Sequence, residues 1–422
     1  MIYKYRLALV ITVCAAFGAP VALGEDICGS LQGDYVAFFE CLFGPGVGPA
    51  PLDPPPTAAD CLEALDYDLD GDVDLHDFAV FQRGYADAQR RKLAPPPNGQ
   101  IYHAAFPDFG GWEDEVSIER IEAFETLAGK PIAWAYFSNN WWRPSPGIQF
   151  PAVAVEAIYC EAGRLPFIRM MPRNELELLP DPDYTMQAFI DGTFDAELTQ
   201  WALEAKAADI PLVVEFGTEC NGSWFPWNAR WNGWYHTTQY GDPGEYDGME
   251  RFRDAYRHII DLFRSLEVDN ITWVFHVDAY NDPDTAWNQM AGYYPGDDYI
   301  DWIGVSAYGP QEPGEGWWWF SDVLNDSWSE ITSISAEGKP IAILEWGVID
   351  YPEVGPKADW ITDGFQSVLP GGAYHPQIKA MSYWHENFDG TNLRIDSSPE
   401  ALAAYQSGVS NPALISQPTL SD

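Results

Sequence analysis

Two glutamates in this chain occupy positions from which they could act as a catalytic pair. Glu219 follows the apolar run IPLVVEFG, which starts at residue 210, and Glu345 closes the run KPIAILEW, which starts at residue 339. Two carboxyl groups that converge across a cleft can cleave a glycosidic bond, because one protonates the leaving oxygen while the other attacks the anomeric carbon. A lone glutamate at a strand end is more often a salt-bridged or capping residue, so the chemistry depends on the elements that carry the two.

Those elements are short apolar runs that alternate with amphipathic helical segments after residue 100. The apolar runs start at residues 101, 131, 165, 210, 271, 299, 339 and 378. Near-continuous apolar runs are typical of strands that are buried on both faces. Eight such strands alternating with helices predict an α/β fold, a closed (β/α)8 TIM barrel. An open doubly wound sheet is the alternative, and it is disfavoured because no glycine-rich phosphate loop follows the first run.

In a (β/α)8 barrel the catalytic groups lie at the C-terminal ends of the strands. Glu219 would follow the fourth strand and Glu345 would close the seventh. Strands four and seven lie on facing sides of the barrel mouth, so the two carboxylates can converge across it. Tryptophan residues lie beside each of them, and the pair therefore favours catalysis over two separate structural roles.

The composition restricts the class of ligand. The net charge is −42, from 64 acidic and 22 basic residues. A surface of that charge repels phosphate backbones and anionic lipid heads, so nucleic acid and membrane surfaces are poor partners and a neutral substrate or a cation is favoured. The chain contains 19 tryptophans, and 15% of its residues are aromatic. Exposed aromatic rings suit the faces of sugars, although burial in the core is an equal alternative for any one tryptophan.

The sharpest local motif is the acidic stretch DYDLDGDVDLHDF at residues 66–78. Carboxylates fall at loop positions 1, 3, 5, 9 and 12, at Asp66, Asp68, Asp70, Asp74 and Asp77. Gly71 stands where a sharp turn is needed, Val73 is expected to face inward, and Asp72 would add a backbone carbonyl. Ca²⁺ takes six to eight oxygen ligands, and this spacing wraps them around one ion. We therefore predict a structural calcium site, with a solvated acidic turn as the alternative.

The acidic loop and the helix after it, LHDFAVFQRGYA, resemble half of a dockerin-type repeat. Residues 33–46, GDYVAFFECLFGPG, look like the helix of a first repeat whose own calcium loop is missing. The resemblance implies a small N-terminal helical module, EF-hand-like or dockerin-like, that binds calcium structurally. In that family such modules dock a partner protein, and the missing first loop argues against docking here.

Proline-rich stretches divide the chain, since they behave as stiff spacers. They predict a calcium-binding module at 25–92, a linker at 93–99, a barrel at 100–412 and a C-terminal tail at 413–422. Residues 1–24 join a basic start to a short apolar run and small residues, which indicates a signal peptide and an exported, secreted or extracytoplasmic protein. Disulfides are then permitted, and Cys41–Cys61 is the preferred pair. The odd number of remaining cysteines leaves at least one unpaired within the chain.

The segment GTECNGSWFPW, which begins at residue 217, resembles the acid/base segment of glycoside hydrolase family 26. Three later segments match the family in order: residues 293–309, the run that starts at 339, and residues 378–405. Together they cover about residues 100–410. The resemblance implies a TIM barrel that cuts β-linked mannans, mixed-linkage glucans or some xylans.

Carried over residue by residue, the resemblance implies that Glu219 is the acid/base and Glu345 the nucleophile. It implies that the Tyr308 hydroxyl holds the nucleophile ionised and oriented. The aromatic residues that would line the sugar site are Trp224, Phe225 and Trp384. Candidates for outer subsites, with packing in the core or a loop as an equal alternative, are Trp142, Trp227 and residues 316–320.

The residue before Glu219 departs from the family pattern. Family members usually carry histidine there, and this chain has Thr218. That position orients the catalytic carboxyl and contacts the sugar near its 2-hydroxyl, so the change bears on the substrate, mannan in particular. Cys220 stands where the family tends to have methionine, and we interpret it as a small apolar packing residue.

Three further polar residues near strand ends could face the cleft, although buried structural roles are favoured for each: His103, His276 and Asp278. The seven histidines show no metal-ligand spacing such as H-E-x-x-H, so no cofactor is expected for catalysis.

The sequence thus predicts an exported retaining endo-β-glycosidase with structural calcium. A β-1,4-mannan is the first expectation for its polysaccharide substrate, and mixed-linkage β-glucan or xylan comes next. A carbohydrate-binding barrel without hydrolytic activity is the rival from another class. A scaffold component that acts through the dockerin-like module is a third reading.

Overall fold

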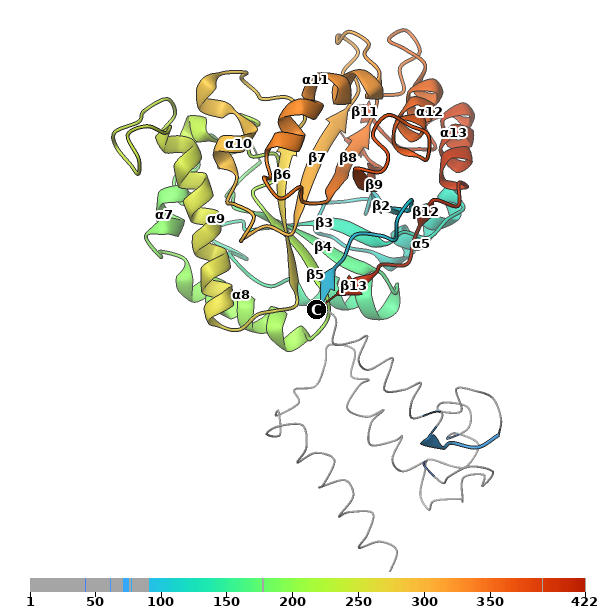
Figure 1. The fold of residues 1–422 in the computed structure, drawn as a ribbon, viewed down its shortest axis with the longest axis horizontal. Coiled ribbons are helices and arrows are strands. Elements are labelled where there is room, and N and C mark those ends of the chain that lie inside the picture. Colours follow the sequence, from blue (N-terminus) through green and yellow to red (C-terminus); the bar gives the residue numbers. More distant parts are fainter. Residues whose placement is uncertain are drawn as a thin grey trace, which may run out of the picture. The chain divides into compact units, whose positions relative to one another are not determined.

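The computed structural model describes residues 91–176, 178–388 and 390–421, together with residues 42, 61, 71–75 and 77. The chain divides into two compact units, residues 1–83 and residues 84–422. The predicted signal peptide, the predicted first helix at 33–46 and Cys41 lie outside the described residues, apart from Leu42. In the larger unit, the described residues form a barrel of parallel strands surrounded by helices (Figure 1).

Eight parallel strands form the barrel in the order of the sequence, and the first pairs with the last. They are β2 (Ile101–Phe106), β3 (Trp134–Asn140), β4 (Leu165–Met171), β5 (Leu212–Phe216), β6 (Ile271–Asp278), β7 (Trp302–Tyr308), β8 (Ile341–Gly347) and β9 (Ile378–Trp384). Each lies in one of the eight predicted apolar runs. The closure of β2 on β9 confirms the (β/α)8 barrel and excludes the open doubly wound sheet.

Helices cover the outside of the barrel because each presents one apolar face to the strands. They are α5 (Ile118–Ala128), α6 (Ala152–Glu156), the π-helical turn η1 (Ala157–Glu161), α7 (Met186–Ile190), α8 (Asp195–Ala208), α9 (Asp247–Ser265), α10 (Met290–Tyr293), α11 (Phe320–Ser333), α12 (Lys357–Val368) and α13 (Pro399–Val409). Short 3₁₀ turns are η2 (Ala229–Trp231) and η3 (Ala286–Asn288). In α9, Phe252, Tyr256 and Phe263 are buried against the barrel.

The core between strands and helices is rich in aromatic side chains. The Trp346 indole on β8 stacks 5.8 Å from that of Trp360 on α12 and packs edge-on against Phe365. Rings that interlock in this way fix the distance between a helix and its strand. The strand ends, where Glu345 and its neighbours lie, are thereby held on a rigid frame.

The ends of the larger unit belong to the barrel more closely than the sequence suggests. β12 (Leu414–Ile415) pairs with β2, and β13 (Leu420–Ser421) pairs with β1 (Lys92–Leu93). Residues predicted as a tail, the last residue predicted for the small module and the first predicted for the linker therefore form strands of the larger unit. Among the helices that the structure describes, none has the length and apolar character needed to cross a bilayer.

Candidate active site

Glu345 lies inside β8, where an irregular register aims its side chain. β7 and β8 pair in parallel, and the register shifts between Val305 and Ser306, so that Ser306 lies opposite Glu345. Irregularities of this kind re-aim side chains next to active sites. The Glu345 side chain is buried at the C-terminal end of the strand, where the fold predicts catalytic groups.

Groups from three other strands hold the Glu345 carboxylate. Tyr308, at the end of β7, donates a 2.9 Å hydrogen bond to Oε2, and Tyr136 on β3 donates a 3.2 Å bond to Oε1. The Arg169 guanidinium on β4 lies 3.4 Å from Oε1. Burial raises the pKa of Glu345 to about 7, while Arg169 acts to lower it and the charge of Glu219 acts to raise it. The predicted contact between Tyr308 and Glu345 is confirmed, and Tyr308 and Arg169 favour the ionised carboxylate against the opposing effect of burial.

Glu219 lies in the loop directly after β5, and its backbone is strained. Its φ angle is +46°, in the left-handed region that costs a non-glycine residue about 1 kcal/mol or more. Gly217 has a φ of +65°, and a Cβ there would come within 2.8 Å of the Phe252 ring, so this turn requires glycine. The Trp224 indole nitrogen donates a 2.9 Å hydrogen bond to Glu219 Oε2. Strain of this kind is typical of functional loops.

Glu219 and Glu345 lie close enough to influence each other's environment. After burial, the charges of both carboxylates raise the pKa of the Tyr308 hydroxyl well above its ordinary value. Burial and then Glu219 likewise raise the pKa of Asp278 at the end of β6. Such coupling weakens with distance, so these groups gather at one mouth of the barrel. Two carboxyl groups in different surroundings at the mouth of a barrel are what an acid and nucleophile pair for glycoside hydrolysis requires.

A buried polar layer lies beneath the two glutamates, and sequence reasoning missed most of it. Glu215 on β5 accepts a 2.5 Å hydrogen bond from Tyr136 and lies 3.5 Å from Arg169 Nε. His276 on β6 lies 2.9 Å from Glu215 through Nδ1 and 2.9 Å from Ser306 through Nε2. Arg169 and Glu215 are charges inside otherwise apolar strand runs. A charge in a strand that is buried on both faces needs a partner, so the presence of a charge in each run is the signal that could have marked both residues as part of a buried pair.

Trp384, predicted to lie beneath the reacting sugar, is buried at the end of β9. Its indole stacks on Phe106 with ring centroids 4.1 Å apart, and the Arg169 guanidinium lies 4.9 Å from its ring. Its nitrogen donates a 2.8 Å hydrogen bond to Glu386. Burial, followed by the charge of Glu113, raises the pKa of Glu386 to about 7. Trp384 is thus fixed in orientation beside Arg169, which also contacts Glu345.

The predicted aromatic residues of the acid/base loop divide into two groups. The Trp224 ring is 41% exposed beside Glu219, and Phe225 is half-buried, so both can meet a ligand. Trp227 is fully buried, with Phe225 stacked on its ring at 4.4 Å. Its nitrogen donates to the Thr218 carbonyl. This corrects the expectation that Trp227 lines an outer subsite, because its ring lies behind the loop and is closed to a sugar.

Two other predicted outer positions keep surface available. Trp142, after β3, is half-buried, with its ring 5.3 Å from the Arg173 guanidinium and 6.4 Å from exposed Trp112. Trp318 donates a 3.0 Å hydrogen bond to the Tyr308 carbonyl, so the run at 316–320 borders the end of β7, where the Tyr308 hydroxyl contacts Glu345. Phe320, the last residue of that run, is buried core.

Of the remaining polar residues, two are structural. His103 is buried between the Pro131 carbonyl and the Tyr405 hydroxyl, and burial lowers its pKa to about 4. Cys220 is a buried free thiol whose pKa burial raises well above the ordinary value, as suits a packing residue. Cys61 and Cys160 each form a disulfide.

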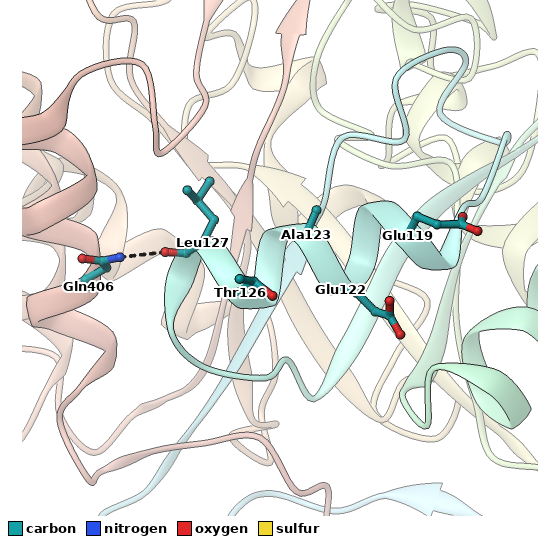
Figure 2. A pocket seen from close by; sticks show the side chains of 6 residues that line it. All are labelled: Glu119, Glu122, Ala123, Thr126, Leu127 and Gln406. Carbon is teal, nitrogen blue, oxygen red and sulfur yellow. Dashed lines mark hydrogen bonds between the residues drawn. The ribbon is translucent and has the colours of Figure 1, made fainter.

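A groove on the outer surface of α5 and α13 is unrelated to the strand ends. Its lining residues are Glu119, Glu122, Ala123, Thr126, Leu127 and Gln406 (Figure 2). Gln406 donates a 2.8 Å hydrogen bond to the Leu127 carbonyl and so joins the two helices. The two glutamates of the groove, Glu119 and Glu122, lie on the exposed surface of α5 and not at the strand ends.

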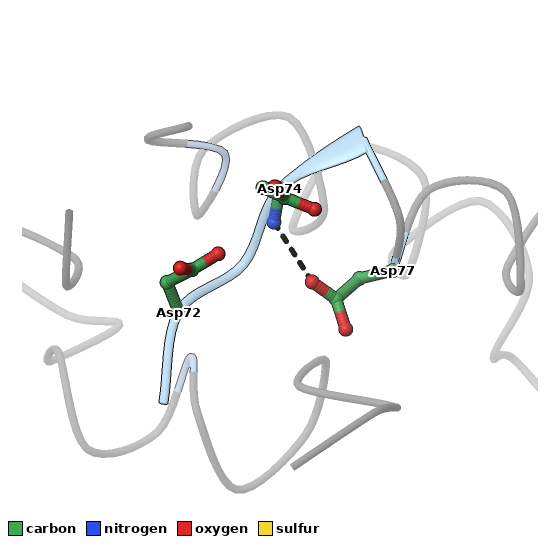
Figure 3. A group of neighbouring side chains, drawn as sticks. All are labelled: Asp72, Asp74 and Asp77. Atoms are coloured by element: carbon green, nitrogen blue, oxygen red, sulfur yellow. Dashed lines mark hydrogen bonds between the residues drawn. The ribbon is translucent and has the colours of Figure 1, made fainter. Parts of the chain in front are cut away.

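In the smaller unit, three residues of the predicted calcium loop lie together (Figure 3). Oxygens from Asp72, Asp74 and Asp77 all lie within 4.8 Å of one another, and Asp74 N–H donates a 2.8 Å hydrogen bond to Asp77. Two oxygens that each lie 2.3–2.6 Å from one Ca²⁺ are at most about 5 Å apart, so the set fits that ion. Gly71 has a φ of +93° and Val73 is fully buried, as the loop motif predicts.

The three remaining predicted ligands, Asp66, Asp68 and Asp70, lie outside the described residues. Asp72 brings its carboxylate to the cluster, where the sequence predicted its backbone carbonyl.

Comparison with known proteins agrees with this geometry. Residues 177–355 match the model of glycosyl hydrolase family 26. Endoglucanase H of Acetivibrio thermocellus is 30% identical over 311 residues, which cover 72% of this chain and 31% of that protein. The mannan endo-1,4-β-mannosidase of Bifidobacterium adolescentis is 25% identical over 260 residues, which cover 59% of this chain and 23% of that protein. The chain thus spans less than a third of the length of these curated relatives.

Solved structures show the same fold. The catalytic domain of the GH26 endo-β-1,4-mannanase of Bacillus sp. JAMB-750 has a TM-score of 0.56 at 20% identity, covering 75% of this chain and 87% of that one. A modular endo-β-1,4-mannanase of Cellulomonas fimi has a TM-score of 0.51 at 19% identity, covering 79% of this chain and 74% of that one. The chain therefore resembles glycosyl hydrolase family 26 in sequence over residues 177–355 and shares its barrel fold.

Proposed function

We propose that the protein is a retaining glycoside hydrolase that cleaves a neutral β-linked polysaccharide within the chain. The observation that carries the proposal is the unequal pair at the barrel mouth. The carboxylate of Glu345 is contacted by Tyr308, Tyr136 and Arg169, while Glu219 lies in a loop with an exposed tryptophan beside it. One carboxylate is placed to attack, and the other to give and take a proton.

The reaction proceeds in two displacements. In the first, Glu219 gives its proton to the glycosidic oxygen, the bond from that oxygen to the anomeric carbon breaks, and a Glu345 oxygen bonds to the carbon. In the second, Glu219 takes a proton from a water molecule, the water oxygen bonds to the same carbon, and the bond from that carbon to Glu345 breaks. Tyr308 and Arg169 stabilise the carboxylate of Glu345 before attack and after release. Trp384 offers a flat ring beneath the reacting sugar.

For the substrate, we favour a β-glucan over the mannan that the sequence suggested first. The similarity to an endoglucanase extends over 311 residues at 30% identity, against 260 residues at 25% for a mannosidase. Thr218 replaces the family histidine that meets the sugar near its 2-hydroxyl, the position at which glucose and mannose differ. Mannan remains the second candidate, on the strength of the mannosidase similarity.

Product analysis on mannan, mixed-linkage β-glucan and xylan tests both parts of the proposal. We expect reducing ends to appear fastest on β-glucan, with internal cleavage and a β-configured first product. Release of reducing ends from none of the three, together with binding of one of them by calorimetry, would replace the proposal by its rival, a carbohydrate-binding barrel without hydrolytic activity.

The acidic loop adds a structural calcium ion to the proposal. The ligands would be Asp66, Asp68, Asp70, Asp72, Asp74 and Asp77, and the ion would neutralise the charge that these carboxylates concentrate. Calorimetric titration of the full chain with Ca²⁺ should give one site, which the double change of Asp74 and Asp77 to asparagine removes. Equal binding by the variant contradicts the assignment.

Export and partner docking rest on sequence alone. Residues 1–24 favour export, and mass analysis of the protein produced in its own host should find a new N-terminus near residue 25. Docking through the dockerin-like module is a weaker proposal, and a truncation at residue 99 that loses partner capture while keeping hydrolysis would support it.

A further inference from the structure

Thr218, the residue before Glu219, is held from two directions. Its hydroxyl oxygen lies 2.7 Å from His276 Nδ1, and its carbonyl accepts a 2.7 Å hydrogen bond from the Trp227 indole. Both Thr218 and His276 are buried. The peptide that leads into Glu219 is therefore fixed by contacts from β6 and from the buried indole of its own loop.

His276 also contacts the residue that follows Glu219. Its backbone carbonyl accepts a 3.3 Å hydrogen bond from the Cys220 N–H. One residue of β6 thus binds both neighbours of Glu219, one through its side chain and one through its backbone. This bracket explains how Glu219 is kept at a φ of +46°, a backbone state that a free loop would leave.

The imidazole is itself oriented by charge. Glu215 Oε2 lies 2.9 Å from Nδ1, and a carboxylate oxygen only accepts, so Nδ1 carries the hydrogen. That hydrogen is shared with Thr218 Oγ1, while Ser306 meets Nε2 at 2.9 Å. Burial acts to lower the pKa of His276, but the carboxylates of Glu215, Glu345 and Glu219 together raise it overall. The ring is held in one orientation by groups on β5, on β7 and in the loop after β5.

We infer that His276, acting through Thr218, is a positioning residue for the proton-transferring carboxyl of Glu219. The inference rests on the proposed function and adds a residue role to it. Glu215 anchors His276 on one side and meets Tyr136 on the other, and Tyr136 also contacts Glu345. The same buried layer therefore sets the position of both glutamates, the nucleophile directly and the acid/base through His276.

Leaving groups of different basicity separate positioning of Glu219 from a structural role. A polysaccharide leaving group needs the proton of Glu219 in the first displacement, whereas 2,4-dinitrophenolate leaves without one. Thr218→Val keeps the shape of the side chain and removes the oxygen that accepts from His276. We expect this variant to lose roughly 10- to 100-fold in kcat on polysaccharide, because a small misplacement of a catalytic group is costly. The burst rate on a dinitrophenyl β-glycoside should stay within about twofold of wild type.

Two variants serve as controls. Thr218→Ser restores the acceptor oxygen and should restore polysaccharide turnover to within about threefold. Thr272→Val removes the hydroxyl of a different buried threonine, which lies on β6. That hydroxyl accepts a 2.7 Å hydrogen bond from Leu93 N–H, far from the site. It should cost stability without changing the ratio of the two rates. His276→Asn should resemble Thr218→Val in that ratio, whatever its melting temperature.

The outcomes are distinct. A selective loss on polysaccharide in Thr218→Val, rescued by serine, supports the inference. Equal loss on both substrates, or no loss on either, overturns it while leaving the proposed function intact. A wild-type protein that hydrolyses neither polysaccharide nor aryl glycoside overturns the proposed function and the inference together.

Discussion

The two glutamates at the barrel mouth differ in what holds them. Glu345 lies in a strand and is bound by side chains from β3, β4 and β7. Glu219 lies in a loop, with its carboxylate bonded to an indole of the same loop and its backbone under strain. This difference in contacts indicates which task each glutamate can perform. Under the proposed function, the nucleophile is built into the rigid frame, while the acid/base, which must change its proton twice per turnover, is carried on a positioned loop.

The largest expected effects are the losses of activity when either glutamate is replaced by glutamine. Glu345→Gln removes the attacking oxygen and should lower kcat by about 10³-fold or more on every substrate.

Glu219→Gln should lower kcat on polysaccharide by about 10²- to 10⁴-fold, yet keep the burst on a dinitrophenyl glycoside. In that burst, the acid limb of the pH profile should shift to lower pH, because the Glu219 charge that raises the pKa of Glu345 is gone. Identical behaviour of the two variants would contradict the division of roles.

Removing Arg169 should destabilise the buried contacts that hold Glu345. Arg169→Met leaves Glu215 and Glu345 buried without their cation, and we expect a loss of about 3–5 kcal/mol in the free energy of unfolding. Arg169 lowers the pKa of Glu345, so the acid limb of kcat/KM should move from near pH 7 to higher pH. Chemical denaturation and a pH series measure the two effects.

The matched control for that experiment is Arg264→Met, which removes an exposed arginine 3.8 Å from Asp261. It should change the free energy of unfolding by less than about 1 kcal/mol and leave the pH profile in place. A loss in Arg169→Met no larger than in this control would show that the buried layer does not stabilise the barrel.

Tyr308→Phe sharpens the comparison with a smaller effect. It removes one hydrogen bond to a charged carboxylate, a contribution of about 1.5–3 kcal/mol, and should lower kcat/KM by roughly 10- to 100-fold. The acid limb should move to higher pH, because a donor to the ionised form of Glu345 is lost. Tyr299→Phe, which removes a surface hydrogen bond to Asp261 from the turn before β7, should change neither quantity. An unshifted limb in Tyr308→Phe would remove Tyr308 from the set that keeps Glu345 charged.

The smallest expected effect is on the side of Glu219. Trp224→Phe keeps an aromatic ring for the sugar and removes the indole N–H that bonds to Glu219. We expect kcat/KM on polysaccharide to fall by about two- to tenfold, the value of a single neutral donor. A fall as large as that of Tyr308→Phe would mean that the two carboxylates are held equally firmly.

The sequence allowed the barrel and the catalytic pair to be predicted, because both leave local patterns. Each of the eight strands is a near-continuous apolar run, and Glu219 and Glu345 stand where two of those runs end. Tyr308 could be assigned only by resemblance. The calcium loop was predicted from spacing, and the turn at Gly71 agrees with it.

The buried layer could not be predicted in the same way, because it depends on strand register. Arg169 and Glu215 lie on neighbouring strands, 46 residues apart in sequence, and meet because β4 and β5 pair in parallel at that level. Trp227 shows the opposite error. It lies three residues beyond Trp224, and local sequence does not tell which of two such tryptophans turns into the core.

In the proposed mechanism, Glu345 forms a covalent bond to the sugar. A 2-deoxy-2-fluoro β-glycoside with a dinitrophenolate leaving group should trap that intermediate, because the fluorine slows both steps and the leaving group restores the first. Peptide mass analysis of the inactivated full chain should place one sugar on Glu345 and none on Glu219. A label on Glu219, or turnover to a product of inverted configuration without any label, would contradict the account.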